Sequence, residues 1–327
     1  MQWEDGVDAG AWIRDRLDAG YDTMHGVVPR GFEAYARVLH PAEVRSMRGS
    51  TVPTDDEWRA FSPDELERVS AAIVDEPATW AEAAAAFGTA LHPLAQWNRI
   101  VGAAPGEDWQ RRRTADGREF SAPLDGELSP ADLARLAAHL VPATTTPDAG
   151  FAAVWAGYGG LTGGYGTTGR GFFGFGAPED DPAAQAHAQM LARSIHDPFN
   201  NVFLKPEWQD GILPREVSEG PHLELPGREY VLFSAPPRAF ADPSWILDAP
   251  WRDLPAEEHG FPPSAQHPNL LWPADRAWVM VSEIDFDSTV VAGSAELVAA
   301  ICADPALEVH PIPEGAALTW DGDGANP

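Results

Sequence analysis

The stretch Pro273–His310 decides the fold, and it reads PADRAWVMVSEIDFDSTVVAGSAELVAAICADPALEVH. From Trp278 to Asp287 the even positions are apolar except for Ser282, whereas the odd positions pass from valine to carboxylate. A period of two places successive side chains on opposite faces of a strand. We therefore expect a strand over 278–287, with one face in the core and a column of carboxylates at the end of the other face.

A helix and a second strand follow this first strand. Gly293 interrupts the chain, Ser294 is a good N-cap, and the apolar residues after it recur at helical spacing. Asp304-Pro305 ends the helix, because the residue before a proline avoids the α conformation. Leu307–Val309 is expected as the next strand. The whole stretch thus predicts a β-α-β unit.

Three further helix starts are well marked. Ser62 and Thr79 each begin a capping box, and Ser129 is an N-cap followed by proline at the first helical position. The helix after Ser62 is expected to bury its apolar side chains, which are Leu66, Val69 and Ile73. Another helix is expected over 181–195. Strands are expected at 32–39, 151–155, 223–225 and 229–234, the last two as a hairpin.

These elements predict an α+β protein with a largely antiparallel sheet, a C-terminal β-α-β unit and N-terminal helices packed on the sheet. The whole chain, 1–327, is expected to form one unit. The polar, proline-punctuated run VPATTTPDAG separates two regions of different pattern. We therefore expect a helix-rich half at 1–140, a linker at 141–150, a strand-rich half at 151–313 and a flexible tail at 314–327.

The composition is that of a globular chain with strong negative charge. Of its 327 residues 44% are hydrophobic, and the net charge is −28. Such a charge repels nucleic acid and anionic membranes but permits a basic protein partner. The alternative is compositional, because one lysine among many arginines indicates a high-G+C coding bias. No apolar run reaches the ~18 residues of a membrane helix and no signal pattern is present, so we expect a cytoplasmic protein.

The chain has a single cysteine, Cys302, so no intrachain disulfide is possible. It shares a helical stripe with Val298 and lies next to Ile301. A thiol in apolar surroundings is protonated and unreactive at neutral pH. We therefore expect Cys302 to be buried and inert.

Glu283, Asp285 and Asp287 are the sharpest chemical feature of the sequence. Carboxylate oxygens are the ligands that Mg²⁺, Mn²⁺ and Ca²⁺ prefer. On a strand, however, alternate residues stand roughly 6.5–7 Å apart, which is wide for one shared ion. A solvated strand end is the favoured interpretation, and a metal site is the alternative. No other cofactor is expected.

Two other features are candidates for a ligand-binding surface. The run Gly157–Gly176 contains ten glycines and one cation, Arg170, but no Lys-Ser/Thr pair that would make it a phosphate loop. A surface loop is expected there, with a ligand lid as the alternative. Trp245, Trp251 and Trp272 occur in or beside a proline-rich region and are candidates to line a groove.

Three segments resemble those of an uncharacterised group of actinobacterial proteins. They are VPRGFEAYARVLHPA (28–42), LELPGREYVLFSAP (223–236) and WPADRAWVMVSEIDFDSTVVAGSAELVAAI (272–301). The resemblance covers roughly residues 26–311 and both halves of the chain, which implies a single co-occurring unit. It implies no activity, cofactor or site residue.

The residues favour a binding or interaction protein without catalysis, because no nucleophile motif, phosphate loop or metal-ligand spacing is present. Two alternatives stay open. One is a divalent-metal-dependent enzyme that uses Glu283, Asp285 and Asp287. The other is an acidic, immunity-type antagonist that blocks a basic partner.

Overall fold

The computed structural model describes residues 1–104, 106–165 and 208–326. The chain divides into two compact units. The first comprises Met1–Trp155, His222–Trp245 and His267–Pro327, and the second comprises Ala156–Pro221 and Ile246–Gln266. The predicted helix over 181–195 and the candidate Arg170 lie outside the described residues.

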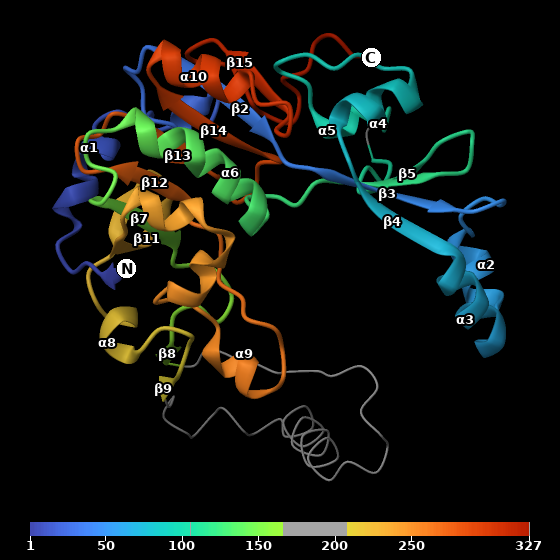
Figure 1. Cartoon of the computed structure of the whole chain (residues 1–327), viewed down its shortest axis with the longest axis horizontal. Coiled ribbons are helices and arrows are strands. Elements are labelled where there is room, and N and C mark those ends of the chain that lie inside the picture. Colours follow the sequence, from blue (N-terminus) through green and yellow to red (C-terminus); the bar gives the residue numbers. More distant parts are fainter. Residues whose placement is uncertain (105, 166–207, 327) are drawn as a thin grey trace. The chain divides into compact units, whose positions relative to one another are not determined.

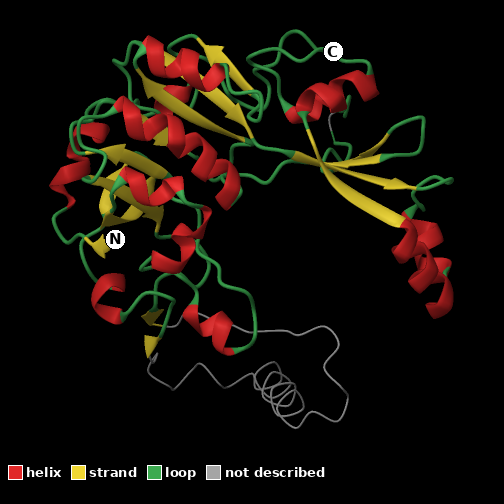
Figure 2. Ribbon diagram, in the orientation of Figure 1, coloured by secondary structure: helices red, strands yellow, loops and turns green. Residues whose placement is uncertain are grey.

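The first unit is built on an antiparallel sheet (Figures 1 and 2). Nine strands form it among the described residues, in the order β1-β11-β7-β12-β13-β14-β2-β15, with β10 paired to β11. The predicted α+β class and largely antiparallel sheet are confirmed. The strands are β1 Gln2–Trp3, β2 Ala34–Leu39, β7 Gly150–Trp155, β10 Leu223–Leu225, β11 Arg228–Ser234, β12 Leu270–Pro273, β13 Val279–Val281, β14 Ser288–Gly293 and β15 Val309–Ile312.

A C-terminal β-α-β unit is present and consists of β14, helix α10 (Ala295–Cys302) and β15, but its first strand is β14 and not the strand expected over 278–287. Both strands pair antiparallel with β2. They therefore run parallel to each other on either side of β2, which the sequence did not predict. Ser294 caps the helix as expected, because its side chain accepts a hydrogen bond from the Leu297 amide (3.2 Å).

The predicted strand over 278–287 is wrong beyond Val281. β13 ends there, the chain turns through 282–287, and β14 returns beside β13. Within the turn the Phe286 amide donates to the Glu283 carbonyl (3.0 Å). Ile284 and Phe286 are half-buried. The alternation of apolar and polar residues therefore continues through the turn, and the sequence gives no sign that the strand ends at Val281.

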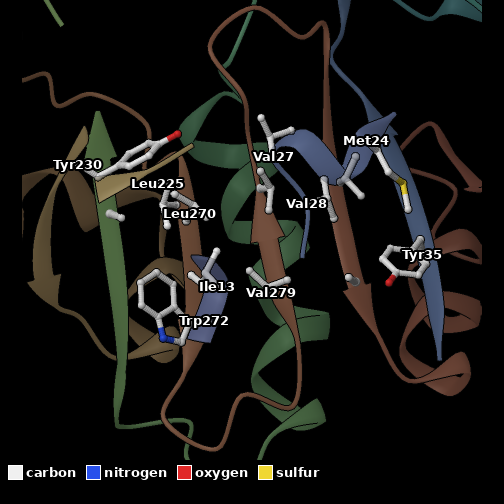
Figure 3. Close-up of a cluster of buried hydrophobic side chains, with 14 of the residues drawn as sticks. Ile13, Met24, Val27, Val28, Tyr35, Leu225, Tyr230, Leu270, Trp272 and Val279 are labelled. Carbon is white, nitrogen blue, oxygen red and sulfur yellow. The ribbon is translucent and has the colours of Figure 1, made fainter. Parts of the chain in front are cut away.

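Each face of the sheet has its own cover. On one face, a buried cluster joins strand residues such as Val279 to Ile13 of helix α1 (Ala11–Arg14) and to Val28 (Figure 3). Trp278 precedes Val279 and therefore points to the opposite face. Its indole donates to the Leu140 carbonyl (2.9 Å) at the end of helix α6 (Pro130–Leu140). The side of the sheet that faces α6 is consequently a second apolar layer.

A smaller antiparallel sheet continues from β2 through His40-Pro41. Its strands are β3 Ala42–Met47, β4 Ile73–Ala78, β5 Arg111–Arg113 and β6 Glu119–Ser121, in the order β4-β3-β6-β5. Helices α4 (Trp80–Phe87) and α5 (Trp97–Ile100) pack on it around the edge-to-face pair of Trp80 and Trp97, whose ring centroids are 5.4 Å apart.

The three predicted helix starts are confirmed. Thr79 accepts from the Glu82 amide at the start of α4, and Ser129 accepts from the Asp132 amide at the start of α6. Ser62 and Glu65 form the capping box of α3 (Pro63–Ala72). The expected burial of Leu66, Val69 and Ile73 is wrong, because α3 has no buried residue and these side chains are half-exposed.

The described part of the second unit contains the strand pair β8 (Gly164–Tyr165) and β9 (Trp208–Gln209). Helices α8 (Arg215–Ser218) and α9 (Leu254–Glu258) belong to the same unit. Arg215 lies against the rings of Tyr165 and Trp208, at 5.3 and 4.7 Å from their centroids. These cation–π contacts connect α8 to the strand pair.

Candidate functional site

Glu283, Asp285 and Asp287, for which a metal site was the alternative interpretation, each contact an arginine. Arg228 Nη2 lies 2.6 Å from Glu283 Oε1 and 2.5 Å from Asp285 Oδ2. Asp287 Oδ1 lies 2.9 Å from Nη2 of a different arginine, Arg37. Among the residues that the structure describes, no group of three His, Cys, Asp or Glu side chains is placed to hold a metal ion. The turn therefore brings Glu283 and Asp285 together on one cation and directs Asp287 to another.

Glu283 is the buried member of this set, with 4% of its surface exposed. Burial raises the pKa of its carboxyl, and the Arg228 guanidinium acts in the opposite direction. The same guanidinium lies 5.2 Å from the centroid of the Trp155 ring. Arg228 thus connects the β13–β14 turn to β7 and β11 through charge and ring contacts.

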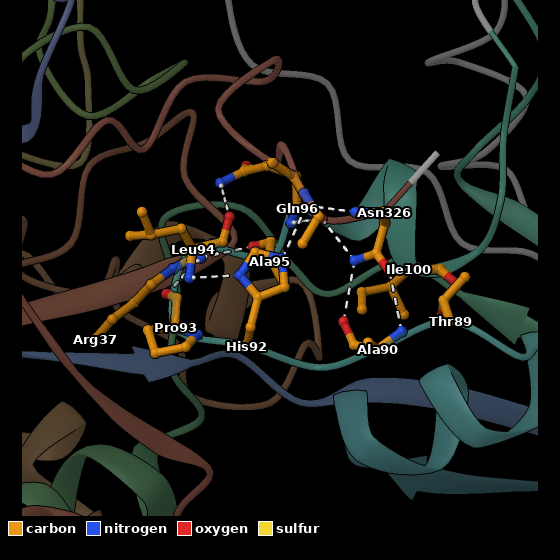
Figure 4. A network of polar contacts seen from close by, with 12 residues as sticks. Arg37, Thr89, Ala90, His92, Pro93, Leu94, Ala95, Gln96, Ile100 and Asn326 are labelled. Atoms are coloured by element: carbon orange, nitrogen blue, oxygen red, sulfur yellow. Dashed lines mark hydrogen bonds and ion pairs between the residues drawn. The ribbon is translucent and has the colours of Figure 1, made fainter.

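Arg37 forms the centre of a second polar cluster (Figure 4). Its side chain is 1% exposed. It donates from Nε to Ser288 Oγ (2.8 Å), from Nη1 to the Ala95 carbonyl (2.6 Å) and from Nη2 to Asp287. The guanidinium carbon also lies 5.5 Å from the Trp80 ring centroid. A single buried cation therefore joins the large sheet to the segment before α5.

The C-terminal segment joins the same region through amide and carboxylate contacts (Figure 4). Asn326 exchanges hydrogen bonds with the Ala90 backbone, at 2.9 and 3.0 Å. Asp323 Oδ1 lies 2.8 Å from His92 Nε2. Burial alone would raise the pKa of Asp323, but hydrogen bonds from Asn326 and His92 outweigh it and lower the pKa to about 2. These contacts connect Asp323 and Asn326 to the segment between α4 and α5.

A buried chain of hydroxyl and imidazole groups lies at the end of β2. His40 Nε2 is 2.9 Å from Thr289 Oγ1, which is hydrogen-bonded to Ser282 Oγ. His40 Nδ1 is 2.7 Å from the Leu124 carbonyl. A carbonyl only accepts, so Nδ1 carries the proton and Nε2 accepts from Thr289. Burial lowers the pKa of His40 to about 4, which keeps the ring neutral.

His267 is a second buried imidazole, with 2% of its surface exposed. Neither ring nitrogen has a hydrogen-bond partner among the described residues. Burial lowers the pKa of His267 to about 3, and His40 acts in the same direction. Both rings are therefore neutral in the folded protein at physiological pH.

Ser282 donates to Thr289 and Thr289 donates to His40, as a hydroxyl nucleophile donates to its base, but the surroundings of these residues do not suit catalysis. Ser282 and Thr289 are both 0% exposed, and the proton on His40 Nδ1 is held by a carbonyl, not by a carboxylate. A nucleophile must reach its substrate. We interpret the hydrogen-bonded row of Ser282, Thr289 and His40 as a structural network. Its only sequence signal was Ser282, the one polar residue at the even positions of its stretch.

The candidate tryptophans are buried. Trp272 belongs to the core cluster and stacks on Phe151 at 5.6 Å, and Trp245 packs on Phe240 at 5.4 Å. Trp251 belongs to the second unit and donates to the Gln266 carbonyl (2.8 Å). Stacking of any of these rings on a ligand would require the covering residues to move.

Cys302 is half-buried, so the expectation of full burial is wrong. The apolar stripe of α10 that faces the core consists of Leu297, Val298 and Ile301, and Cys302 lies at its border. Partial burial nevertheless raises the pKa of the thiol. A thiol with a raised pKa is a weak nucleophile at neutral pH.

A cleft in the first unit has a volume of about 760 Å³. Its lining combines strands β3 and β4 with the segments before α6 and before β15. The apolar part of the lining includes Leu39, Pro77 and Leu124, and Leu124 is 67% exposed. Its carboxylates are Glu43, Asp75, Glu76, Asp132 and Glu308, and no described lysine, arginine or histidine lines it. We call this cavity the acidic cleft.

The five carboxylates of the acidic cleft are not equally free. Asp75 is paired with Arg45 (2.7 Å). Glu308 accepts from the amides of Trp80 (2.6 Å) and Ala81 (2.8 Å) at the start of α4, and burial raises its pKa. Asp132 is half-buried and accepts from Ser129 Oγ (2.6 Å). Glu43 and Glu76 are exposed and form no ion pair among the described residues. These two side chains are the available anions of the cleft.

Comparisons with protein-family models, with curated proteins and with solved structures found no match to this chain. No helix in the described part of the chain combines the length and the apolar character needed to cross a bilayer.

The contacts of Asp285 and Asp287 predict that replacing each with asparagine lowers the free energy of unfolding by a different amount. Asp285 is 74% exposed at the side chain, so Asp285→Asn should change the free energy of unfolding by less than about 1 kcal/mol. Asp287→Asn should cost about 1–3 kcal/mol, because it removes the charge that compensates buried Arg37. Urea denaturation of both variants measures this difference. Equal costs would contradict the role of Asp287 in compensating Arg37. A saturable shift of Tm with millimolar Mg²⁺ that Asp285→Asn abolishes would support a metal site instead.

Proposed function

We propose that this protein is a non-catalytic binding protein that takes a basic protein segment in the acidic cleft. One observation carries the proposal: a cleft of about 760 Å³ has an apolar lining and carboxylates, but no described basic side chain. Lysine and arginine side chains combine an apolar stem with a cationic end. A segment that contains them is complementary to this cleft in both respects.

Charge over the whole chain supports the same partner. The net charge is −28, and a cleft lined by one sign of charge concentrates ligands of the opposite sign. Complementary potentials also increase association rates. Antagonism of a basic partner, one of the functions considered from the sequence, is compatible with this proposal. The contacts of Arg37 and Arg228 with the carboxylates of the β13–β14 turn weigh against the metal-dependent enzyme.

The proposal is tested with a fluorescein-labelled octapeptide that alternates arginine and leucine. The double variant Glu43→Gln/Glu76→Gln removes the two available anions and should weaken binding at least fivefold in fluorescence anisotropy. The dependence of Kd on NaCl should also become shallower, because fewer exposed charges take part. Leu124→Ser should weaken binding at constant charge, since it removes apolar surface from the lining.

The matched control is Glu216→Gln/Glu258→Gln, which removes two exposed carboxylates that do not line the cleft. It changes the net charge of the chain equally. If both double variants weaken binding to the same extent, the peptide responds to overall charge alone, and the assignment of the cleft is wrong.

A further inference from the structure

The two helices between β3 and β4 are unusual because neither packs into a core. Helix α2 (Asp55–Ala60) and helix α3 (Pro63–Ala72) have no buried residue. They lie at the far end of β3 and β4 (Figure 1). Trp58 and Phe61 form an edge-to-face pair with centroids 5.9 Å apart. We call this pair of helices the α2–α3 arm.

The arm presents an apolar stripe at helical spacing. Leu66 and Val69 lie one turn apart on α3, and Ile73 follows as the first residue of β4; all three are half-exposed. Val74 beyond them is 42% exposed. A surface helix with such a stripe usually buries it against another element. An isolated helix of this length is also marginally stable in water, so a covering partner would stabilise it.

Charge complementarity decides which partner can cover this stripe. Between Thr54 and Glu76 the chain carries eight carboxylates and two arginines. Glu57 and Glu65 serve as capping residues, but Asp56, Asp64 and Glu67 are exposed. A second copy of the chain would bring equal negative charge to the contact. A basic partner would be attracted to it.

The arm is also continuous with the acidic cleft. β4 begins at Ile73, directly after α3, and its residues Asp75–Ala78 line the cleft. At about 3.3 Å per residue, Ile73, where the apolar stripe ends, lies roughly 7 Å along the strand from Asp75, the first of these cleft residues. A single helical partner of a few turns can reach both surfaces.

We propose that the α2–α3 arm is the docking surface for an amphipathic helix with a basic polar face, supplied by a partner protein. The apolar face of that helix covers Leu66, Val69 and Ile73, and its lysines or arginines face the carboxylates of the arm. The proposal rests on the proposed function and adds to it the secondary structure of the partner and the place where its apolar face binds.

The test uses two fluorescein-labelled 18-residue peptides of leucine and lysine with identical composition. One has its leucines at helical spacing, and the other has them in scrambled order. The helical peptide should bind at least tenfold more tightly in anisotropy measurements. Leu66→Gln/Val69→Gln should remove this preference, because glutamine keeps helix propensity but lacks the apolar surface. The control is Leu247→Gln/Leu254→Gln, which alters two exposed leucines elsewhere and should keep the preference.

The outcomes separate the two proposals. If both peptides bind equally and only Glu43→Gln/Glu76→Gln weakens them, the acidic cleft binds basic segments and the inference on the arm is wrong. If neither peptide binds the unaltered protein, both proposals are wrong. If light scattering shows self-association that Leu66→Gln/Val69→Gln abolishes, a second copy covers the stripe and the inference is overturned.

Discussion

Replacing Arg37 with methionine is expected to lower the free energy of unfolding by about 3–5 kcal/mol. The guanidinium is 1% exposed and compensates Asp287. It also donates to Ser288 Oγ and to the Ala95 carbonyl. Methionine has a similar apolar stem, so the loss comes from an uncompensated carboxylate and unpaired acceptors. Urea denaturation at pH 7 measures it.

The matched control for this prediction is Arg59→Met, which removes an exposed arginine from an ion pair with Asp56 (3.0 Å). Its expected cost is below about 1 kcal/mol. Adding Asp287→Asn to Arg37→Met should restore part of the lost stability, because the carboxylate is then no longer charged and unpaired. If Arg37→Met costs no more than Arg59→Met, the buried cluster does not hold the two sheets together.

The free energy of unfolding is also expected to fall by roughly 3–4 kcal/mol between pH 7 and pH 5 because of His40 and His267. The pKa is lowered from 6.5 to about 4 for His40 and to about 3 for His267 in the folded protein. Below pH 6.5 the unfolded chain therefore binds protons that the folded chain excludes. The stabilisation by the neutral rings is complete above 6.5 and is lost as the pH falls toward the folded values.

Urea denaturation at pH 7, 6 and 5 tests this prediction, with His267→Leu as the variant. Burial raises the pKa of Glu283 and Glu308, which acts in the opposite direction, so the comparison with the unaltered protein isolates the histidine. The variant should lose about 2 kcal/mol less over this range. Identical pH dependence in His267→Leu and the unaltered protein would contradict the prediction.

Local sequence was sufficient to predict a helix or strand wherever the interactions that form it lie within a few residues. The caps at Thr79, Ser129 and Ser294 satisfy amides within three residues, so their side chains identify the helix starts without knowledge of the fold. The strand expected over 32–39 is β2, and the hairpin around Pro226-Gly227 is β10–β11. Alternation and turn residues encode both.

The candidate site could not be predicted in this way. The sequence correctly singled out Glu283, Asp285 and Asp287 as chemically notable, but their cations come from positions far away in the chain. Arg228 precedes Asp285 by 57 residues and Arg37 precedes Asp287 by 250. A carboxylate that repels its neighbours on an extended strand is stabilised in a turn that places an arginine beside it.

The same reason explains what the alternation over 278–287 determined and what it did not. It identified the buried positions of β13 and the polar end that follows. The break at Val281 depends on contacts of the turn with other segments, among them the hydrogen bond from Gly126 to the Phe286 carbonyl (2.7 Å). The acidic cleft likewise forms only where β3, β4 and the segments before α6 and β15 meet. Composition and pattern determined the helices, the strands and the charge of this protein. Tertiary contacts decided the pairing of buried charges and the lining of the cleft, because ion pairs and cavities depend on distance in space and not on separation along the chain.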